Sequence, residues 1–166
     1  AGPYTYLWSP NGETTNAITV SAPGSYSAQV TDNCGGSVNT GATSVTENPV
    51  PVATAGSNSP VCVGSALNLS GASDLVGSTF SWTGPLSYVS TDEDPQVSAS
   101  ATTGMAGTYV LTATLNGCTS APSNAVVVVN SPATIVSTTA TPTTICPGGS
   151  SQLQVNLAGG AYCSTV

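Results

Sequence analysis

The fold of this chain is indicated most directly by Gly107-Thr108-Tyr109-Val110-Leu111-Thr112-Ala113, a run that continues to Leu115. Every second residue from Tyr109 to Leu115 is apolar, and side chains at every second position share one face of an extended strand. Asn116-Gly117 then supplies the residues of a tight turn before Cys118. The stretch therefore predicts a half-buried β-strand over 107–116.

A second copy of this pattern lies earlier in the chain, at Gly24-Ser25-Tyr26-Ser27-Ala28-Gln29-Val30. An aromatic strand precedes each copy, with Trp8 in the first and Trp82 in the second. A cysteine follows each copy, and a Val-rich strand then runs into an Asn/Pro break at Asn48 or Asn130. Self-similarity at a fixed spacing of roughly 80 residues indicates tandem copies of one domain.

The central copy, residues 49–130, is complete. Pro60-Val61-Cys62-Val63-Gly64 opens it, ahead of an alternating strand with Leu67 and Leu69. The chain is rich in Thr, Ser, Val, Gly and Pro, so β-strands and turns are expected rather than helices. We predict an all-β chain of tandem β-sandwich domains, with central strands at 50–56, 65–70, 78–83, 95–101, 107–116 and 123–130.

The other copy is split. Residues 1–48 lack an opening of this kind, and that opening is found in 131–166, as Thr144-Ile145-Cys146-Pro147-Gly148-Gly149 before a strand with Leu153 and Leu157. Reading 131–166 into 1–48 rebuilds a whole sandwich. Three explanations remain: the chain is one repeat cut from a longer tandem protein, its C-terminal strands complete the next subunit by strand complementation, or both fragments close within one chain. Closure within one chain is disfavoured, because the two ends of a sandwich of this kind lie at opposite poles.

Composition excludes several classes of function. The 166 residues include no Lys, Arg or His, seven acidic residues and only 4% charged residues, for a net charge of −7. Without cations, phosphate contacts to nucleic acid and a polybasic membrane anchor are excluded. Without His or Lys, general acid–base catalysis and the common zinc sites lose their usual side chains. No apolar run approaches the roughly 18 residues of a membrane span. We expect neither an enzyme nor a cofactor.

The two copies resemble the Ig-like/PKD-like repeats found in large secreted surface adhesins of bacteria. The resemblance covers essentially the whole chain and is carried by the Trp strand, the Gly-x-Tyr motif and the cysteine positions. Short strands, a Trp on the third strand and a tyrosine corner are features of immunoglobulin-like sandwiches. The resemblance implies an extracellular protein at the bacterial cell surface. Such repeats serve as spacers, adhesins and enzyme accessory domains alike, so the fold alone does not choose among these functions.

The cysteines are expected to form disulfides. If strand two and the penultimate strand are antiparallel, Cys62 reaches Cys118 at one pole of the central domain, and Cys34 pairs in the same way with Cys146 of the neighbouring unit. Disulfides of this kind belong to an oxidising compartment. Cys163 has no counterpart, so it is either an intermolecular thiol or an unpaired one.

The remaining candidate sites have competing interpretations. Asp92, Glu93 and Asp94 form the one acidic cluster, and carboxylates in a loop are ligands for Ca²⁺. The cluster lacks the spacing of a calcium loop, which favours a solvated acidic loop. The aromatic residues of the two motifs could stack on carbohydrate, but their equivalent positions in both copies favour core packing. These residues are Trp8, Trp82, Tyr26 and Tyr109.

The sequence therefore favours a structural role. The leading hypothesis is a repeat unit of an extracellular bacterial filament or giant cell-surface adhesin, whose partners are copies of itself in a linear or helical polymer, with a surface or host ligand as a further partner. The rival hypothesis is a carbohydrate- or receptor-binding accessory module of a secreted enzyme. An exposed aromatic row or a deep pocket would favour the rival.

Overall fold

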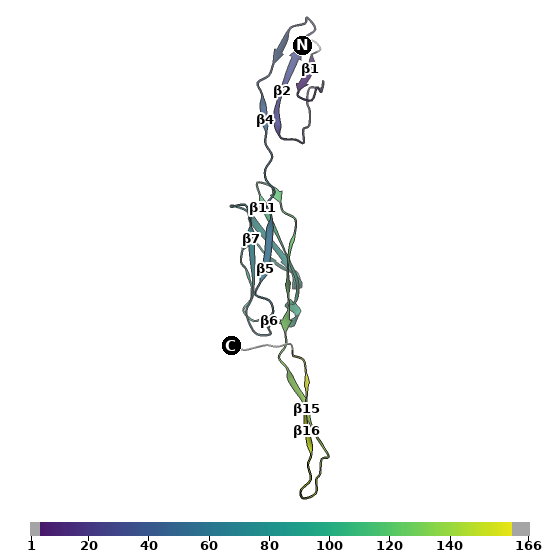
Figure 1. Ribbon diagram of the computed structural model, residues 1–166. Helices are drawn as coiled ribbons and strands as arrows, with labels where there is room; N and C mark the ends of the chain where they lie inside the picture. The colour runs from purple at the N-terminus through teal and green to yellow at the C-terminus, as the bar shows by residue number, and fades with distance from the viewer. Residues whose placement is uncertain (1–3, 161–166) are drawn as a thin grey trace. The chain divides into compact units, whose positions relative to one another are not determined.

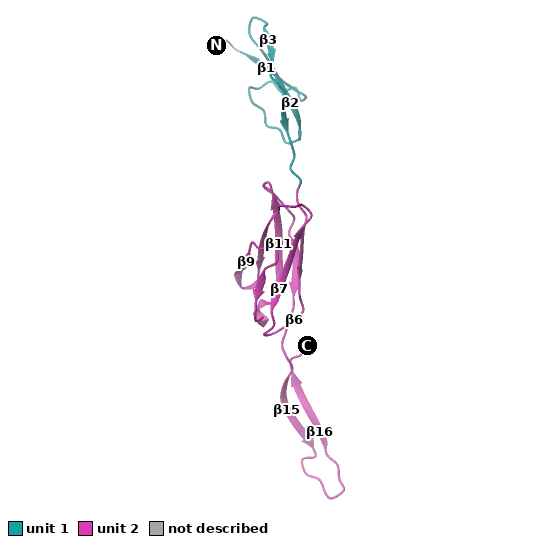
Figure 2. Ribbon diagram, turned by 90° about the vertical axis from the view of Figure 1, so that its left-hand side faces the viewer, with its two compact units in different colours: residues 1–49 teal, residues 50–166 magenta. Residues whose placement is uncertain are grey.

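The computed structural model describes residues 4–160 and divides the chain into two compact units, residues 1–49 and 50–166 (Figures 1 and 2). Apart from two 3₁₀ turns, the regular elements of the described residues are all strands, which confirms the all-β prediction. None of the described residues forms a helix long and apolar enough to cross a membrane. The unit boundary after Pro49 falls one residue beyond the expected end of the first fragment.

Unit 1 contains a single antiparallel sheet. Strand β2 (Gly24–Thr31) lies at its centre, with β1 (Thr5–Ser9) on one side. The other side of β2 pairs with β3 (Ser37–Asn39) and, nearer its start, with β4 (Thr43–Val45). No second sheet covers this one among the residues that the structure describes in unit 1.

The central domain is a two-sheet sandwich. One sheet has the order β10-β7-β5, and the other has the order β12-β11-β8-β9, with β13 also paired to β11. A short parallel pair joins β14 to β6. The bounds of these elements are β5 (Ala53–Ser57), β6 (Val61–Cys62), β7 (Leu67–Ser73), β8 (Thr79–Gly84), η1 (Pro85–Ser87), β9 (Tyr88–Ser90), β10 (Gln96–Ser98), η2 (Thr103–Met105), β11 (Gly107–Leu115), β12 (Cys118–Thr119), β13 (Ser123–Val127) and β14 (Val129–Asn130).

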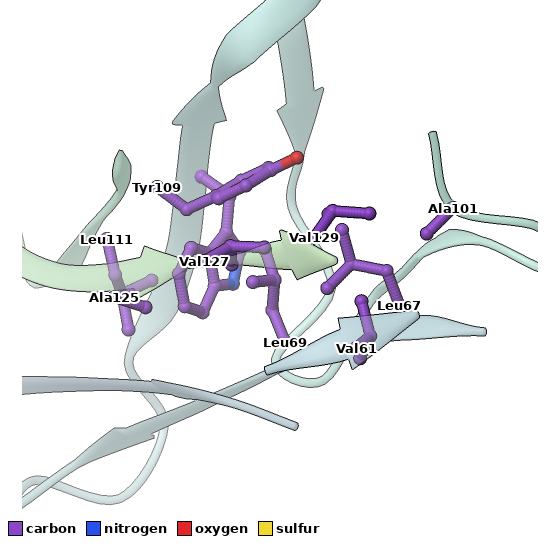
Figure 3. Close-up of a cluster of buried hydrophobic side chains, with 10 residues drawn as sticks. Val61, Leu67, Leu69, Ala101, Tyr109, Leu111, Ala125, Val127 and Val129 are labelled. Carbon is purple, nitrogen blue, oxygen red and sulfur yellow. The ribbon is translucent and has the colours of Figure 1, made fainter. Parts of the chain in front are cut away.

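The core of the central domain is built from alternate residues of these strands. Trp82, Tyr109 and Leu111 are completely buried, and Leu111 lies directly opposite Trp82 in the register of β8 and β11. Figure 3 shows Tyr109, Leu69, Val127 and their neighbours pointing toward one another between the strands. The half-buried strand predicted over 107–116 is therefore confirmed, because each buried residue of β11 is separated from the next by a residue that is not fully buried.

The Gly-x-Tyr motif of β11 has a local geometric reason. Gly107 has φ of 143°, a conformation that side-chain-bearing residues rarely adopt, and a Cβ there would lie 2.8 Å from Cγ of Pro85. Two residues later the Tyr109 hydroxyl donates a hydrogen bond to the carbonyl of Met105 at 3.0 Å. This bond from a Tyr to the backbone four residues upstream forms the predicted tyrosine corner.

The final pair of strands is a separate two-stranded hairpin. It consists of β15 (Thr134–Thr141) and β16 (Gln152–Ala158), which pair only with each other among the described strands. A turn that contains Cys146 joins them. An isolated two-stranded hairpin is marginally stable in water, because it has no second layer on which to bury its apolar face.

Candidate assembly interface

Three strands of unit 1 have the registers of three strands in one sheet of the central sandwich. In unit 1 Trp8 lies opposite Ala28 and Gly24 lies opposite Val45, as Trp82 lies opposite Leu111 and Gly107 opposite Val127 in the central domain. The strands β1, β2 and β4 therefore correspond to β8, β11 and β13 in the same register. The hydroxyl of Tyr26 donates to the carbonyl of Ala22 at 2.9 Å, which is a second tyrosine corner.

The hairpin reproduces part of the other half. In β5 and β7 the opposing pairs are Ala53 with Ser73, Ala55 with Gly71 and Ser57 with Leu69. In β15 and β16 the corresponding pairs are Ile135 with Leu157, Thr138 with Val155 and Ala140 with Leu153. One irregularity between Ile135 and Ser137 inserts a residue into β15 without changing which face these pairs share.

Equivalent side chains in the central domain and in the hairpin differ strongly in their exposed fractions. Leu69 is 2% exposed in the central domain, whereas its counterpart Leu153 is 80% exposed. Val61, which immediately precedes Cys62, is 8% exposed, whereas Ile145, which immediately precedes Cys146, is 56% exposed. We define the hairpin face as Ile135, Leu153, Val155 and Leu157, all of which are large, apolar and exposed.

The corresponding surface in unit 1 is one side of its sheet. We define the sheet face as the positions equivalent to the central core residues of β8 and β11: Tyr6, Trp8, Tyr26, Ala28 and Val30. Tyr26 and Ala28 are buried within unit 1, whereas Tyr6, Trp8 and Val30 are only half-buried. The Trp8 indole Nε1 donates to the carbonyl of Thr15 at 2.9 Å, as Trp82 Nε1 donates to Glu93 at 3.3 Å.

One strand of the sandwich also lacks its partner in unit 1. In the central domain β10 pairs with β7. The corresponding stretch of unit 1, with Ile18 and Val20 half-buried, has no strand pairing. The strand β16, which is the counterpart of β7, also leaves one edge unpaired among the described strands.

The structure corrects the cysteine prediction. Cys62 and Cys118 are not joined by a disulfide. Cys62 lies opposite Asn130, just beyond the end of β11 where Gly107 pairs with Val127, whereas Cys118 lies opposite Leu115 at the other end. Nine residues of strand, about 27–30 Å, separate these poles, and a disulfide requires Cα atoms within about 7 Å. The prediction failed because it placed both cysteines at one pole.

The same argument applies to the split copy. Cys34 lies in the turn after β2 and Cys146 in the turn before β16, the positions equivalent to the two separated poles, and both carry exposed free thiols. The pairing of Cys34 with Cys146 of a neighbouring unit stays a prediction, which this separation of the poles disfavours. Cys163 lies outside the described residues.

The acidic cluster is an exposed loop in which two of the three carboxylates accept hydrogen bonds from other residues. Oδ1 of Asp94 accepts a hydrogen bond from the backbone N–H of Gly71 at 3.0 Å, and Asp92 exchanges hydrogen bonds with Ser90. Between residues 4 and 160 the structure contains no group of three His, Cys, Asp or Glu side chains placed to hold a metal. Asp92, Glu93 and Asp94 thus do not converge on a common point.

A surface cavity of about 680 Å³ lies in unit 1. Its lining includes Leu7, Gln29, Asn39 and Thr40, together with Trp8, and contains no acidic side chain. The cavity therefore offers no pair of carboxylates for glycoside hydrolysis.

Two tyrosines of the central domain resist ionisation. Burial raises the pKa of Tyr109 above its usual 10.0, and the neighbouring Tyr88 raises it further. The two rings meet edge to face, with centroids 5.6 Å apart. Burial likewise raises the pKa of Tyr88, partly opposed by a hydrogen bond with Ser90 and reinforced by the charge of Asp92.

These pKa shifts lead to a stability prediction. Because the folded state holds the Tyr109 phenol neutral, its contribution is fully present below pH 10 and is lost as the pH rises through the raised folded pKa. Tyr109→Phe should cost about 1 kcal/mol at pH 7, from the lost bond to Met105, and should weaken the loss of stability above pH 10. Urea unfolding from pH 7 to 11 measures both effects. An unchanged alkaline slope in the variant would show that Tyr109 is not responsible.

Comparisons with known proteins find similarity in fold without a family assignment. No protein-family profile matches the chain, and no curated protein matches it. The amphioxus IgVJ-C2 molecule is 18% identical with a TM-score of 0.41, over 75% of this chain and 88% of that one. Sidekick-1 immunoglobulin domains 1–5 are 17% identical with a TM-score of 0.43, over 82% of this chain and 36% of that one.

A third similar structure is Drosophila OTK, extracellular domains 3–5, at 9% identity and a TM-score of 0.34. Its alignment covers 80% of this chain and 55% of that one, so this chain spans only part of the length of OTK domains 3–5 and of Sidekick-1 domains 1–5. All three are structures with immunoglobulin-type or tandem extracellular domains, as their names state. The description of this chain as β-sandwich domains rests on its own strands and registers.

Proposed function

We propose that this chain is a structural repeat unit of an extracellular bacterial filament or giant cell-surface adhesin. In this assembly the hairpin β15–β16 of one unit covers the sheet face of unit 1 in the next and completes its sandwich. The observation that carries the proposal is the contrast between Leu69, 2% exposed in a finished sandwich, and Leu153, 80% exposed at the equivalent position of the hairpin.

Matching registers support the proposal independently of burial. Unit 1 has the registers of β8, β11 and β13, and the hairpin has those of β5 and β7, so together the two fragments contain the principal strands of one sandwich. Burying each large apolar side chain of the hairpin face favours association by about 1.5–3 kcal/mol before the entropic costs are counted. The segment around Ile18 and Val20 would gain β16 as its strand partner.

The composition is suited to a protein that is exposed to proteases and to changes in salt concentration outside the cell. A chain without Lys or Arg has no cleavage site for trypsin-like proteases. The hairpin face and the sheet face contain no charged side chain, so their contact should be insensitive to salt. The bacterial and extracellular location is proposed from the resemblance of the motifs to surface-adhesin repeats.

Sedimentation velocity of the full chain across a concentration series, with reductant present to exclude disulfide cross-links, tests the proposal. We expect the average mass to rise with concentration above 16.2 kDa, through species whose masses are whole multiples of the chain mass. Electron microscopy should show unbranched linear particles. A mass that stays at 16.2 kDa throughout the series would contradict assembly between units.

A further inference from the structure

A close contact in the central sandwich explains why residue 71 is glycine. A Cβ at Gly71 would lie 3.1 Å from Cδ2 of Leu111, 3.3 Å from Cζ2 of Trp82 and 2.7 Å from the carbonyl oxygen of Glu93. Distances this short require a neighbour to move, and Leu111 and Trp82 are completely buried in the core. A larger residue at position 71 would therefore require the Glu93 carbonyl to shift and would crowd Leu111 and Trp82.

The split copy changes both partners of this contact, in opposite directions. Val155 takes the place of Gly71, because each lies nine residues after the cysteine that precedes its strand, Cys146 or Cys62. Ala28 takes the place of Leu111, because it opposes Trp8 as Leu111 opposes Trp82. From Leu to Ala the sheet loses three side-chain carbons, and from Gly to Val the hairpin gains three. The summed volume of the pair is therefore nearly conserved across two fragments that are more than a hundred residues apart.

The third neighbour of Gly71 is the carbonyl of Glu93, and the residue that supplies the corresponding carbonyl differs between the copies. Glu93, whose carbonyl accepts from the indole of Trp82, follows that tryptophan by 11 residues, whereas Thr15 follows Trp8 by 7. The connection that crosses the Trp strand is thus shorter in unit 1.

On the basis of the proposed function, we propose that Ala28 and Val155 form a size-matched pair that selects the partner of the hairpin. The partner is the sheet face of a second copy of this chain. Val155 would overlap Leu111, so the hairpin cannot replace β5 and β7 in a central domain. Gly71 would leave a void beside Ala28, so β5 and β7 cannot complete unit 1 equally well. The pair thereby keeps two similar sandwiches from exchanging halves.

A double-mutant cycle on the full chain tests the pairing. Ala28→Leu overpacks the contact and Val155→Gly leaves a void, and we expect each to weaken association by about tenfold or more in sedimentation velocity. The double variant A28L/V155G recreates the Leu/Gly pair of the central domain and should recover most of the lost affinity. Gln29→Leu and Gln154→Gly, at neighbouring positions on the opposite faces of the same strands, are controls that should leave association nearly unchanged.

Ala28 is buried within unit 1, so circular dichroism must show that A28L folds. If it does not, Val155→Phe overpacks the same contact from an exposed position of the hairpin and should also reduce association at least tenfold. Two results would contradict the size-matched pair while leaving the proposed assembly in place, provided that wild-type chains associate. In the first, the double variant associates no better than the single variants. In the second, A28L does not fold and V155F associates as strongly as the wild type. If wild-type chains do not associate, the proposed function itself fails.

Discussion

Leu153→Asp is expected to abolish association of the chain while leaving the central domain as stable as before. In the single chain Leu153 is 80% exposed, so the aspartate remains in water and costs the monomer little. In the completed sandwich the residue would take the position of Leu69, which is 2% exposed. A carboxylate without a partner in such a site costs several kcal/mol, which corresponds to a loss of at least a hundredfold in affinity.

The matched control for this substitution is Gln154→Asp. It adds the same charge to the same strand, but on the face opposite Leu153, so its effect on association should be small. Sedimentation velocity measures association, and thermal unfolding followed by circular dichroism measures the central domain. Equal weakening by both variants would show that charge, rather than burial of the hairpin face, governs assembly.

Trp82→Ala is expected to destabilise the central domain by about 3–5 kcal/mol, a large share of the 5–15 kcal/mol that stabilises a typical domain. The side chain is completely buried and packs against Leu111, Leu69 and Gly71, and its Nε1 donates to the carbonyl of Glu93. Its removal leaves a cavity and an unused acceptor. Urea unfolding followed by circular dichroism gives the change in the free energy of unfolding.

Val89→Ala on the neighbouring strand β9 provides the comparison, because Val89 is exposed and should change stability by no more than about 0.5 kcal/mol. A loss below about 1 kcal/mol for Trp82→Ala would contradict the placement of Trp82 in the packed core.

Local patterns in the sequence were sufficient to predict most of the central strands. The prediction over 107–116 became β11, because alternation with period two reports directly on which face of a strand is buried. The prediction over 123–130 became two short strands, β13 and β14, since the chain leaves β11 after Val127 to pair with β6. Short strands such as β9 and β12 were missed, because two or three residues carry no readable periodicity.

The cysteine pairing could not be predicted, because it depends on strand direction rather than on spacing. The number of residues between Cys62 and Cys118 is nearly the same as that between their counterparts in the split copy. This agreement indicates only that the two domains are alike, and not that the cysteines are close in space. Which pole each cysteine occupies is set by the parallel pairing of β14 with β6, a contact between segments some 70 residues apart. The exchange of volume between Ala28 and Val155 could not be predicted for a similar reason. It becomes visible only when the register of β1 with β2 and that of β15 with β16 are both known.

The central claim is that the hairpin of one chain completes unit 1 of another, and a mixture of two full-length variants tests it most directly. Leu153→Asp disables the hairpin face and Trp8→Ala disables the sheet face, so neither variant should associate alone. The intact hairpin of the Trp8→Ala chain can still dock on the intact sheet face of the Leu153→Asp chain, and this pairing cannot propagate. We predict a 1:1 complex of twice the 16.2 kDa chain mass in sedimentation velocity. Two species that stay at 16.2 kDa after mixing, while wild-type chains associate, would contradict the account.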